Sequence, residues 1–434
     1  MNNPPSTFCI LLLLLSSTLY AYPIDGYAST GIRRLERLRL IVAQALPGKA
    51  PVTGARKTST EIKLHLVESA HDDVYFFHED PKLKTQLTAL FSQEDPHYSL
   101  LILDLNAERP RYATLRPDEL YKPGSVGKLA VAAGFFTELA RLYPDPADRL
   151  RLLKNHKVTA SAWIRSDHHT IPVFDPTTRA YKARLLREGD VFSLYEWLDH
   201  MLSASSNSAA SMVWKEAMLM RAFGKDYPPS AQAESEFFKK TPPLERQKLS
   251  LSVVNDPLRT LGIPSEAWQL GSFFTRAGKQ QVPGVQSYAN PRALLIFLLR
   301  LEQGRIVDPW SSLELKKLIY MTARRIRYAA ADNLSTSAVY FKSGSEYKCQ
   351  AETGFVCREY AGNVKNYMNS VAIVEHPGRQ AYLAVLMSNV LRKNSANDHK
   401  RMAEAIDRLV ISFDPPPPPV VPARVPTAAV KRAK

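Results

Sequence analysis

Strand-like and helix-like segments are segregated along this chain, and this segregation restricts its fold more than any other feature. An apolar run over residues 99–105 and a second run over 112–115 are typical of two short strands joined by a turn at 108–111, and Leu83, Leu87, Leu90 and Phe91 precede them with helical spacing. Residues 126–320 then follow a mostly helical period, interrupted by loops that contain Pro, Gly and Ser. The chain therefore places a long helical stretch after its first strands.

Strand-like runs return only near the end, over 339–343, 370–375 and 382–387. A last helix follows, with Met402, Ile406, Leu409 and Val410 on one face. Because early and late strands must bury their apolar faces together, this order predicts an α+β fold. We expect an antiparallel sheet flanked by helices, with a mostly helical subdomain beside it, over residues 76–413.

The two ends of the chain differ from this central region. Residues 1–21 carry no charged side chain, contain an apolar run over 8–15 and end at Ala21, a pattern that predicts a secretory signal peptide and a periplasmic or secreted protein. A retained anchor is the alternative, but the run is too short to span a bilayer. Beyond Ala21 no stretch approaches about 18 consecutive apolar residues, so no transmembrane helix is expected in the mature chain. Residues 414–434 include a run of prolines and end in basic residues, which predicts a disordered tail.

Residues 22–75 form an N-terminal extension with one amphipathic basic segment. Its apolar positions are Ile32, Leu35, Leu38, Val42 and Leu46, and Pro47 follows them. We predict a helix that is docked on the main domain; a helix that lies on a membrane surface is the alternative.

Charge and cysteine content restrict the partners. The formal net charge of +15 favours contact with anionic polymers of a cell envelope, and the absence of a nucleic-acid-binding motif argues against nucleic acid.

Cys349 and Cys357 are the cysteines left after Ala21, and their spacing favours a local disulfide, with two unpaired thiols as the alternative. Adjacent histidines occur in Asp167-His168-His169, which we interpret as a solvated loop rather than a metal site because successive side chains diverge. No metal or cofactor is predicted.

Three short motifs carry the chemistry. The first, Ser125-Val126-Gly127-Lys128, precedes an apolar run typical of a buried helix. Residues three apart share a helical face at roughly 5–6 Å between Cβ atoms, so a lysine desolvated there can act as the base for a serine nucleophile. A second Ser-x-x-Lys, Ser345 to Lys348, lacks this context and is given no role as nucleophile and base.

The second motif, Ser205-Ser206-Asn207, lies between two helical stretches, where residues two apart can face one cavity. Ser205 can then relay a proton to a leaving group while the Asn207 amide holds a substrate amide, although Ser and Asn also cap helices without any catalytic role. The third motif, Lys342-Ser343-Gly344, is predicted at a strand end. There Lys342 and Ser343 can bind a carboxylate, and Gly344 lets a substrate backbone approach.

In this order the motifs resemble those of the penicillin-recognising serine enzymes, most closely the class A β-lactamases. Residues 205–210, Ser-Ser-Asn-Ser-Ala-Ala, are similar to the Ser-Asp-Asn-Thr-Ala-Ala of class A enzymes, and 290–309 resemble the helix before their last strands. The resemblance covers roughly residues 80–412. It implies that Ser125 is acylated with Lys128 as base, that Ser205 protonates the leaving nitrogen, and that Asn207, Lys342 and Ser343 bind substrate. It also implies an oxyanion hole made by the backbone N–H groups of Ser125 and Ser345.

The sequence departs from that family in the loop before Asn290. Class A enzymes carry there a Glu-x-x-Leu-Asn whose Glu activates the water that releases the acyl group, whereas residues 264–289 hold one acid, Glu266, without the partner Asn. Ser206 also replaces the Asp of the second motif, and an insertion over 161–187 separates the first two motifs. Acylation is therefore better supported than turnover.

Three interpretations follow. The leading one is an exported serine hydrolase that is acylated at Ser125 by a β-lactam or a related amide bearing a carboxylate. A D-Ala-D-Ala carboxypeptidase or transpeptidase that takes peptidoglycan-type peptides is the second. A non-catalytic envelope-binding module is the third, and it would be favoured by a missing catalytic residue, whereas all three motifs are present.

Overall fold

The computed structural model describes residues 24–68, 78–91, 96–106, 110–320, 325–379 and 381–413. The predicted signal peptide (1–21) and disordered tail (414–434) lie outside these residues, as does part of the turn predicted at 108–111. Within the described ranges, no helix is long and apolar enough to cross a membrane.

A single antiparallel sheet unites the early and late strands. Its strands are β1 (Tyr98–Asp104), β2 (Arg111–Leu115), β9 (Ala338–Lys348), β10 (Lys365–Glu375) and β11 (Ala381–Asn389). They lie in the order β2-β1-β11-β10-β9, so that β1 pairs with β11 and β9 is an edge strand. The predicted α+β fold is confirmed, and the three late strands are longer than the apolar runs that indicated them.

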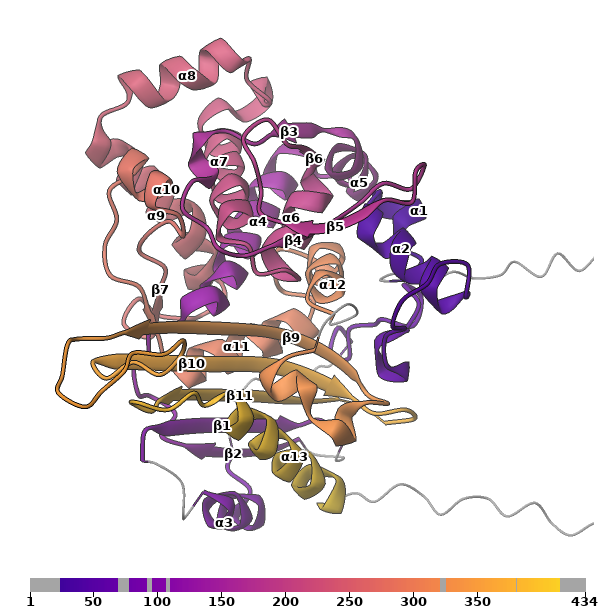
Figure 1. The fold of residues 1–434 in the computed structure, drawn as a ribbon, viewed down its shortest axis with the longest axis vertical. Coiled ribbons are helices and arrows are strands. Elements are labelled where there is room, and N and C mark those ends of the chain that lie inside the picture. The colour runs from indigo at the N-terminus through magenta and orange to yellow at the C-terminus, as the bar shows by residue number, and fades with distance from the viewer. Residues whose placement is uncertain are drawn as a thin grey trace, which may run out of the picture.

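Alternate residues of the sheet enter two different cores. Leu100 and Ile102 point to one core, which is covered by α3 (Pro81–Leu90) and α13 (Ala396–Phe413). Leu101 and Leu103 belong to the other core, on the side of α11 (Pro291–Glu302) and the helical subdomain. Figure 1 shows the sheet between these two layers, with α11 along one face and α13 along the other. The period of two in the strands produces this division.

The helical subdomain is built around α4 (Lys128–Leu142), most of whose residues are buried. Its apolar composition is typical of a helix surrounded on every side, and Figure 1 shows it at the centre of the subdomain. The helices of the subdomain are α4 (Lys128–Leu142), α5 (Pro146–Asn155), α6 (Leu194–Leu202), α7 (Asn207–Phe223), α8 (Ala231–Lys240), α9 (Pro243–Thr260), α10 (Arg276–Gln281) and α12 (Pro309–Leu318).

Three small two-stranded sheets accompany these helices. They are formed by β3 (Lys157–Thr159) with β6 (Val191–Ser193), β4 (Ile171–Phe174) with β5 (Tyr181–Arg184), and β7 (Trp268–Gln269) with β8 (Tyr288–Ala289). The β4–β5 hairpin lies within the insertion over 161–187.

The N-terminal extension contacts the main domain. It contains α1 (Gly26–Thr30) and α2 (Arg33–Val42), and the buried Arg34 donates two hydrogen bonds of 2.6 Å to the Asp199 carboxylate on α6. Bidentate pairs of this kind fix both distance and orientation. The amphipathic segment is thus a helix docked on the subdomain, and Figure 1 shows α2 in this position. Its apolar face is buried in the protein and is not free to lie on a membrane.

A second contact of the extension is a buried ionic cluster. The Lys316 ammonium lies 2.6 Å from a Glu302 carboxylate oxygen and 2.8 Å from one of Glu375, and His65 of the extension lies 3.0 Å from Glu302. Burial raises the pKa of Glu302, but Lys316 and His65 outweigh burial and lower that pKa to about 2. Since both carboxylates stay ionised, the cluster holds the extension against β10 and α11.

Candidate active site

Ser125 lies in a short 3-10 turn, η3 (Gly124–Gly127), directly before α4. The turn is reached through Gly124, whose φ of 53° favours glycine. The Asn369 amide on β10 donates to the carbonyl oxygens of Lys122 and Pro123 at 2.8 and 3.2 Å, which fixes the approach to the turn. The nucleophile candidate therefore lies at the positive end of a buried helix dipole.

The Lys128 ammonium nitrogen, Nζ, joins the first two motifs. It lies 2.8 Å from Ser125 Oγ, 2.6 Å from the Ser205 carbonyl oxygen and 2.8 Å from Asn207 Oδ1. Its ordinary positive charge is costly here, because burial lowers the pKa of Lys128 to about 7 while the Asp167 carboxylate acts in the opposite direction. Near neutral pH a large share of this lysine is an uncharged amine.

The three contacts of Lys128 give that amine a definite orientation. A neutral amine has two N–H groups and one lone pair, and the Ser205 carbonyl and Asn207 Oδ1 can only accept hydrogen bonds. Both N–H groups are therefore directed to these two acceptors, and the lone pair is directed to the Ser125 hydroxyl. This geometry is that of a base ready to take the proton of Ser125.

Ser205 lies between two lysines. Its φ of 58° is in the left-handed region, which places it on the sharp turn between α6 and α7. Lys342 Nζ donates to Ser205 Oγ at 2.8 Å, and Lys128 Nζ lies 3.4 Å from the same oxygen. Burial, and then the charges of Lys128 and Arg327, lower the pKa of Lys342 well below its usual value. The Ser205 hydroxyl can thus exchange protons with either lysine.

The third motif lies within β9 rather than at its end, which corrects the sequence-based placement. The strand continues to Lys348 because its residues keep pairing with β10, with Ser345 opposite Met368. A side chain at Gly344 would place its Cβ 2.1 Å from the Pro123 carbonyl oxygen and 2.9 Å from the Ser125 nitrogen. Gly344 is therefore required by the protein's own nucleophile turn.

The same close contact brings together the segments that carry the two predicted oxyanion-hole nitrogens. A Cβ at Gly124 would lie 2.7 Å from the Ser345 backbone nitrogen, so the turn and the strand meet backbone to backbone. Ser343, which is buried, lies on β9 between Lys342 and this contact. The contacts of Lys128 with Ser125, Ser205 and Asn207, and of Lys342 with Ser205, thus connect the three motifs.

Arg327 is a residue of this site that the sequence analysis did not identify. It begins the 3-10 turn η6 (Arg327–Ala330), and its guanidinium donates to the Gly344 carbonyl oxygen at 3.0 Å and to Ser345 Oγ at 3.1 Å. It also lies 5.1 Å from the centre of the Tyr360 ring. Burial lowers the pKa of Arg327, but an arginine remains charged at neutral pH. No motif marks it, because it lies outside β9.

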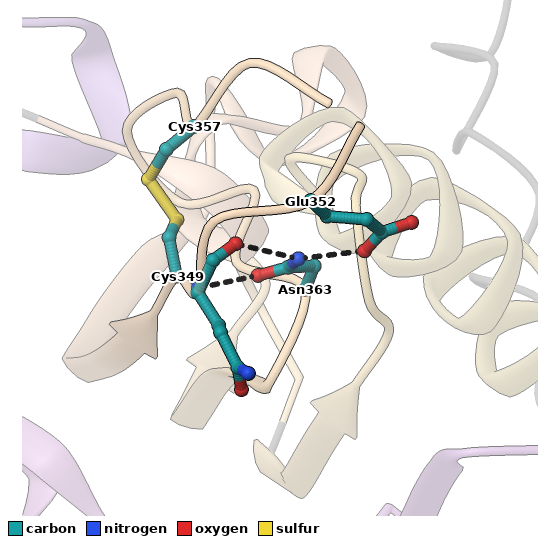
Figure 2. Close-up of a disulfide and its surroundings, with 5 residues drawn as sticks. Cys349, Glu352, Cys357 and Asn363 are labelled. Carbon is teal, nitrogen blue, oxygen red and sulfur yellow. Dashed lines mark hydrogen bonds between the residues drawn. A yellow bond between two sulfur atoms is a disulfide. The ribbon is translucent and has the colours of Figure 1, made fainter. Parts of the chain in front are cut away.

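Tyr360 belongs to the loop between β9 and β10, which a disulfide closes. Cys349 and Cys357 are bonded, with their Cα atoms 5.9 Å apart (Figure 2). The Asn363 side chain accepts from the Gln350 N–H at 2.9 Å and donates to Glu352 at 2.8 Å, so both arms of the loop are held. The disulfide and these hydrogen bonds therefore fix the loop that follows Ser345 at the end of β9.

The loop over 264–289 presents apolar side chains to the turn η3 and to the start of α4. The Phe274 ring centre lies 5.0 Å from Lys128 Nζ, and a Cβ at Gly127 would lie 2.9 Å from a Leu270 methyl group. Glu266, the one acid of this loop, is exposed and its carboxylate accepts from the Ser265 hydroxyl. No carboxylate of this loop thus lies beside Ser125.

The interpretation of Asp167-His168-His169 as a solvated loop is wrong for Asp167. Its side chain is only 5% exposed, because its carboxylate accepts hydrogen bonds from the first turn of α7. His168 is exposed, as expected for a solvated loop. A contact between Asp167 and the second motif could not be seen in the sequence, because 39 residues separate Asp167 from Ser206.

A family model described as the β-lactamase enzyme family matches residues 82–410. Among curated proteins, none matches this chain in sequence.

Solved structures share the fold at low sequence identity. The TLA-3 extended-spectrum β-lactamase is 13% identical, with a TM-score of 0.51, and covers 76% of this chain and 98% of its own. A variant of the TLA-1 extended-spectrum β-lactamase is 12% identical, with a TM-score of 0.50 and the same two coverages. A penicillin G acyl-enzyme of a PBP-A variant is also similar, at 13% identity, 76% and 97% coverage and a TM-score of 0.48.

The family match spans most of the chain and contains all three motifs, and within it Lys128 contacts Ser125 while Lys342 contacts Ser205. The chain belongs to the β-lactamase enzyme family of active-site serine hydrolases.

Proposed function

We propose that the protein is an exported serine hydrolase of the class A β-lactamase-like type, in which Ser125 is acylated by a β-lactam or a related amide that bears a carboxylate. The observation that carries this proposal is the contact of Lys128 Nζ with Ser125 Oγ at 2.8 Å, in surroundings that lower the pKa of Lys128 to about 7. A serine with a neutral amine aimed at its hydroxyl is an activated nucleophile.

The reaction runs through the groups already placed. Ser125 Oγ attacks the carbonyl carbon and its proton passes to Lys128 Nζ, while the negative charge on the carbonyl oxygen is taken up by the N–H groups of Ser125 and Ser345. When the C–N bond breaks, Ser205 donates a proton to the leaving nitrogen and regains one from Lys128 or Lys342, both of which contact its hydroxyl. No cofactor takes part in this sequence.

The substrate carboxylate would bind at the cationic end of the site. Lys342 and Ser343 of the third motif supply an amine nitrogen and a hydroxyl as hydrogen-bond donors, and the charged Arg327 guanidinium lies against the neighbouring Gly344 and Ser345. Asn207, already in contact with Lys128, would hold the substrate amide. This supports a substrate with an amide and a carboxylate close together, as in penicillins and in D-alanyl peptides.

A second candidate is the carboxypeptidase or transpeptidase reaction on D-alanyl peptides of the cell wall. It is favoured by the loop over 264–289, which turns Phe274 to Lys128 and leaves Glu266 at the surface. Without a carboxylate to activate water, a penicilloyl group on Ser125 would leave slowly. Export and contact with the envelope are supported by the N-terminal apolar run and by the net charge of +15.

Incubation with penicillin, followed by intact-mass measurement over time, separates these candidates. The wild-type protein should gain one penicilloyl mass and Ser125→Ala none; absence of the adduct in the wild type would refute the proposal. An adduct that persists for hours, together with release of D-alanine from a D-Ala-D-Ala peptide, supports the wall reaction. Rapid loss of the adduct with catalytic formation of penicilloic acid supports β-lactam hydrolysis and excludes the slow-release account.

A further inference from the structure

The second motif lacks a carboxylate of its own, and one is supplied to it from elsewhere. Class A enzymes carry Ser-Asp-Asn as their second motif, whereas this chain has Ser206 in the middle position. The Asp167 carboxylate lies against it: one oxygen, Oδ2, accepts from Ser206 Oγ and from the Ser208 backbone N–H, each at 2.8 Å. Asp167 belongs to the insertion over 161–187, just after the 3-10 turn η4 (Ala162–Ile164).

The other oxygen of Asp167 is also occupied. It accepts from the His169 backbone N–H at 3.1 Å and lies 2.7 Å from His169 Nδ1. Ligand atoms of Asp167, His168 and His169 do lie within 4.8 Å of one another, but a metal ion would have to displace these bonds. For the same reason the carboxylate is not free to activate a water molecule. Its four contacts are those of a group that fixes structure.

What Asp167 fixes is the pair of residues on either side of Ser206. Ser206 is the N-cap of α7, where its hydroxyl accepts from the Ala209 N–H at 3.1 Å while it donates to Asp167. Ser205 precedes it with a left-handed backbone, and Asn207 follows it. Both neighbours contact Lys128 Nζ, so a shift of this turn would displace the two acceptors that orient the amine.

Asp167 also contributes charge to the site. The charged and titratable groups that face Lys128 are Asp167 and His169 from the insertion and Lys342 from β9. Burial raises the pKa of Asp167, but hydrogen bonds from His169 and from Ser208 outweigh burial and hold that pKa below its usual range. Burial lowers the pKa of His169, and the Asp167 carboxylate acts in the opposite direction. The negative charge of Asp167 therefore raises the pKa of Lys128, against the larger effect of burial.

We propose that Asp167 is a positioning residue that supplies, from the insertion, the carboxylate which the second motif lacks, and that it holds Ser205 and Asn207 against Lys128. This inference rests on the proposed function in that it assigns the residue a part in acylation of Ser125. It predicts that an acid at position 206 can take over the role of the acid at position 167. An acid at position 206 should slow acylation when Asp167 is still present.

Four variants test this relocation. Asp167→Asn keeps the shape of the side chain and should slow penicillin acylation on the order of 10- to 100-fold, the cost of misplacing reacting groups by about 1 Å. Ser206→Asp alone should also slow it, because two buried carboxylates then lie within hydrogen-bonding distance and repel each other. The double variant Asp167→Asn/Ser206→Asp should recover most of the loss. Asp175→Asn is the matched control, since the carboxylate of this exposed aspartate of the same insertion accepts hydrogen bonds within its own turn, from Thr177 and Thr178.

Two readouts separate positioning from mere stabilisation of the fold. The pH midpoint of acylation should move to lower pH in Asp167→Asn and return in the double variant, and it should not move in Asp175→Asn. The titration of Lys128, followed by NMR of protein labelled with ¹⁵N-lysine, should shift in the same direction without any substrate. Failure of the wild type to be acylated would refute the proposed function, while the NMR titration would still decide this inference.

The inference is overturned if the double variant is no faster than the slower single variant. It is equally overturned if Asp167→Asn leaves the titration of Lys128 where it is in the wild type.

Discussion

The acylation rate should depend on pH in a way that reports the protonation of Lys128. Only the neutral amine can accept the proton of Ser125, and burial lowers the pKa of this lysine to about 7. With that pKa, about 1% of the lysine is neutral at pH 5 and about 90% at pH 8, so the second-order rate constant should rise roughly 90-fold across this interval. Above pH 8 it should reach a plateau.

An ordinary lysine would behave differently in the window from pH 8 to 9. With a pKa near 10.5 the neutral fraction would still rise about tenfold over that unit, whereas the buried Lys128 should gain only about 10%. Stopped-flow measurement of acylation by a fluorescent penicillin, at constant ionic strength, resolves the two cases. A rate constant that keeps rising tenfold per unit above pH 8 would refute the assignment of Lys128 as a desolvated base.

Three further changes test other parts of the account. Lys128→Met should abolish acylation and change how stability depends on pH. The unfolded chain binds a proton at this lysine up to about pH 10.5 and the folded chain only up to about pH 7, so the free energy of unfolding of the wild type should rise by about 4 kcal/mol relative to that of the variant between pH 7 and pH 10.5 in chemical denaturation; a difference between the two proteins that stays constant over this window would contradict the assignment. Arg327→Met should reduce kcat/KM for acylation by penicillin by roughly 10- to 100-fold, because a charge-assisted hydrogen bond to the substrate carboxylate is lost. The same variant should reduce kcat/KM for a penicillin methyl ester far less. Equal losses for both substrates would show that Arg327 does not bind the carboxylate. Glu266→Gln should leave the rate of loss of the penicilloyl mass unchanged, since Glu266 is exposed and bonded only to Ser265, and a slower release would identify Glu266 as the missing base.

The fold was predictable from the sequence because its strands and helices have clean periodicities. The run over 382–387 alternates between two cores in the structure, with Leu383 and Val385 in one and Ala384 and Leu386 in the other. Strand ends were less predictable: β9 runs on to Lys348 through Gly344, where turn-forming residues suggested an end, because pairing with β10 continues past the glycine. Local sequence does not contain that tertiary pairing.

The candidate site was predictable as far as its groups lie in short motifs. Ser125 and Lys128 are three residues apart, and the resemblance of the ordered motifs to those of class A β-lactamases implied that Ser205 and Lys342 act at the same site. Asp167 and Arg327 were missed because each reaches the site from a loop with no recognisable spacing to the motif that it serves. Such contacts depend on how separate segments pack, which one sequence does not reveal.

The measurement that tests the central claim most directly is the location of the penicilloyl group after limited exposure to penicillin. Proteolysis and mass spectrometry of the quenched protein should find the adduct on the peptide that contains Ser125. The chain offers an internal control in its second Ser-x-x-Lys, since Ser345 is bonded to Arg327 and lies on a strand, where Lys348, three residues on, faces the opposite side. An adduct at Ser125 that Ser125→Ala abolishes is the predicted result. An adduct at Ser345, or no adduct on either peptide, would contradict the account.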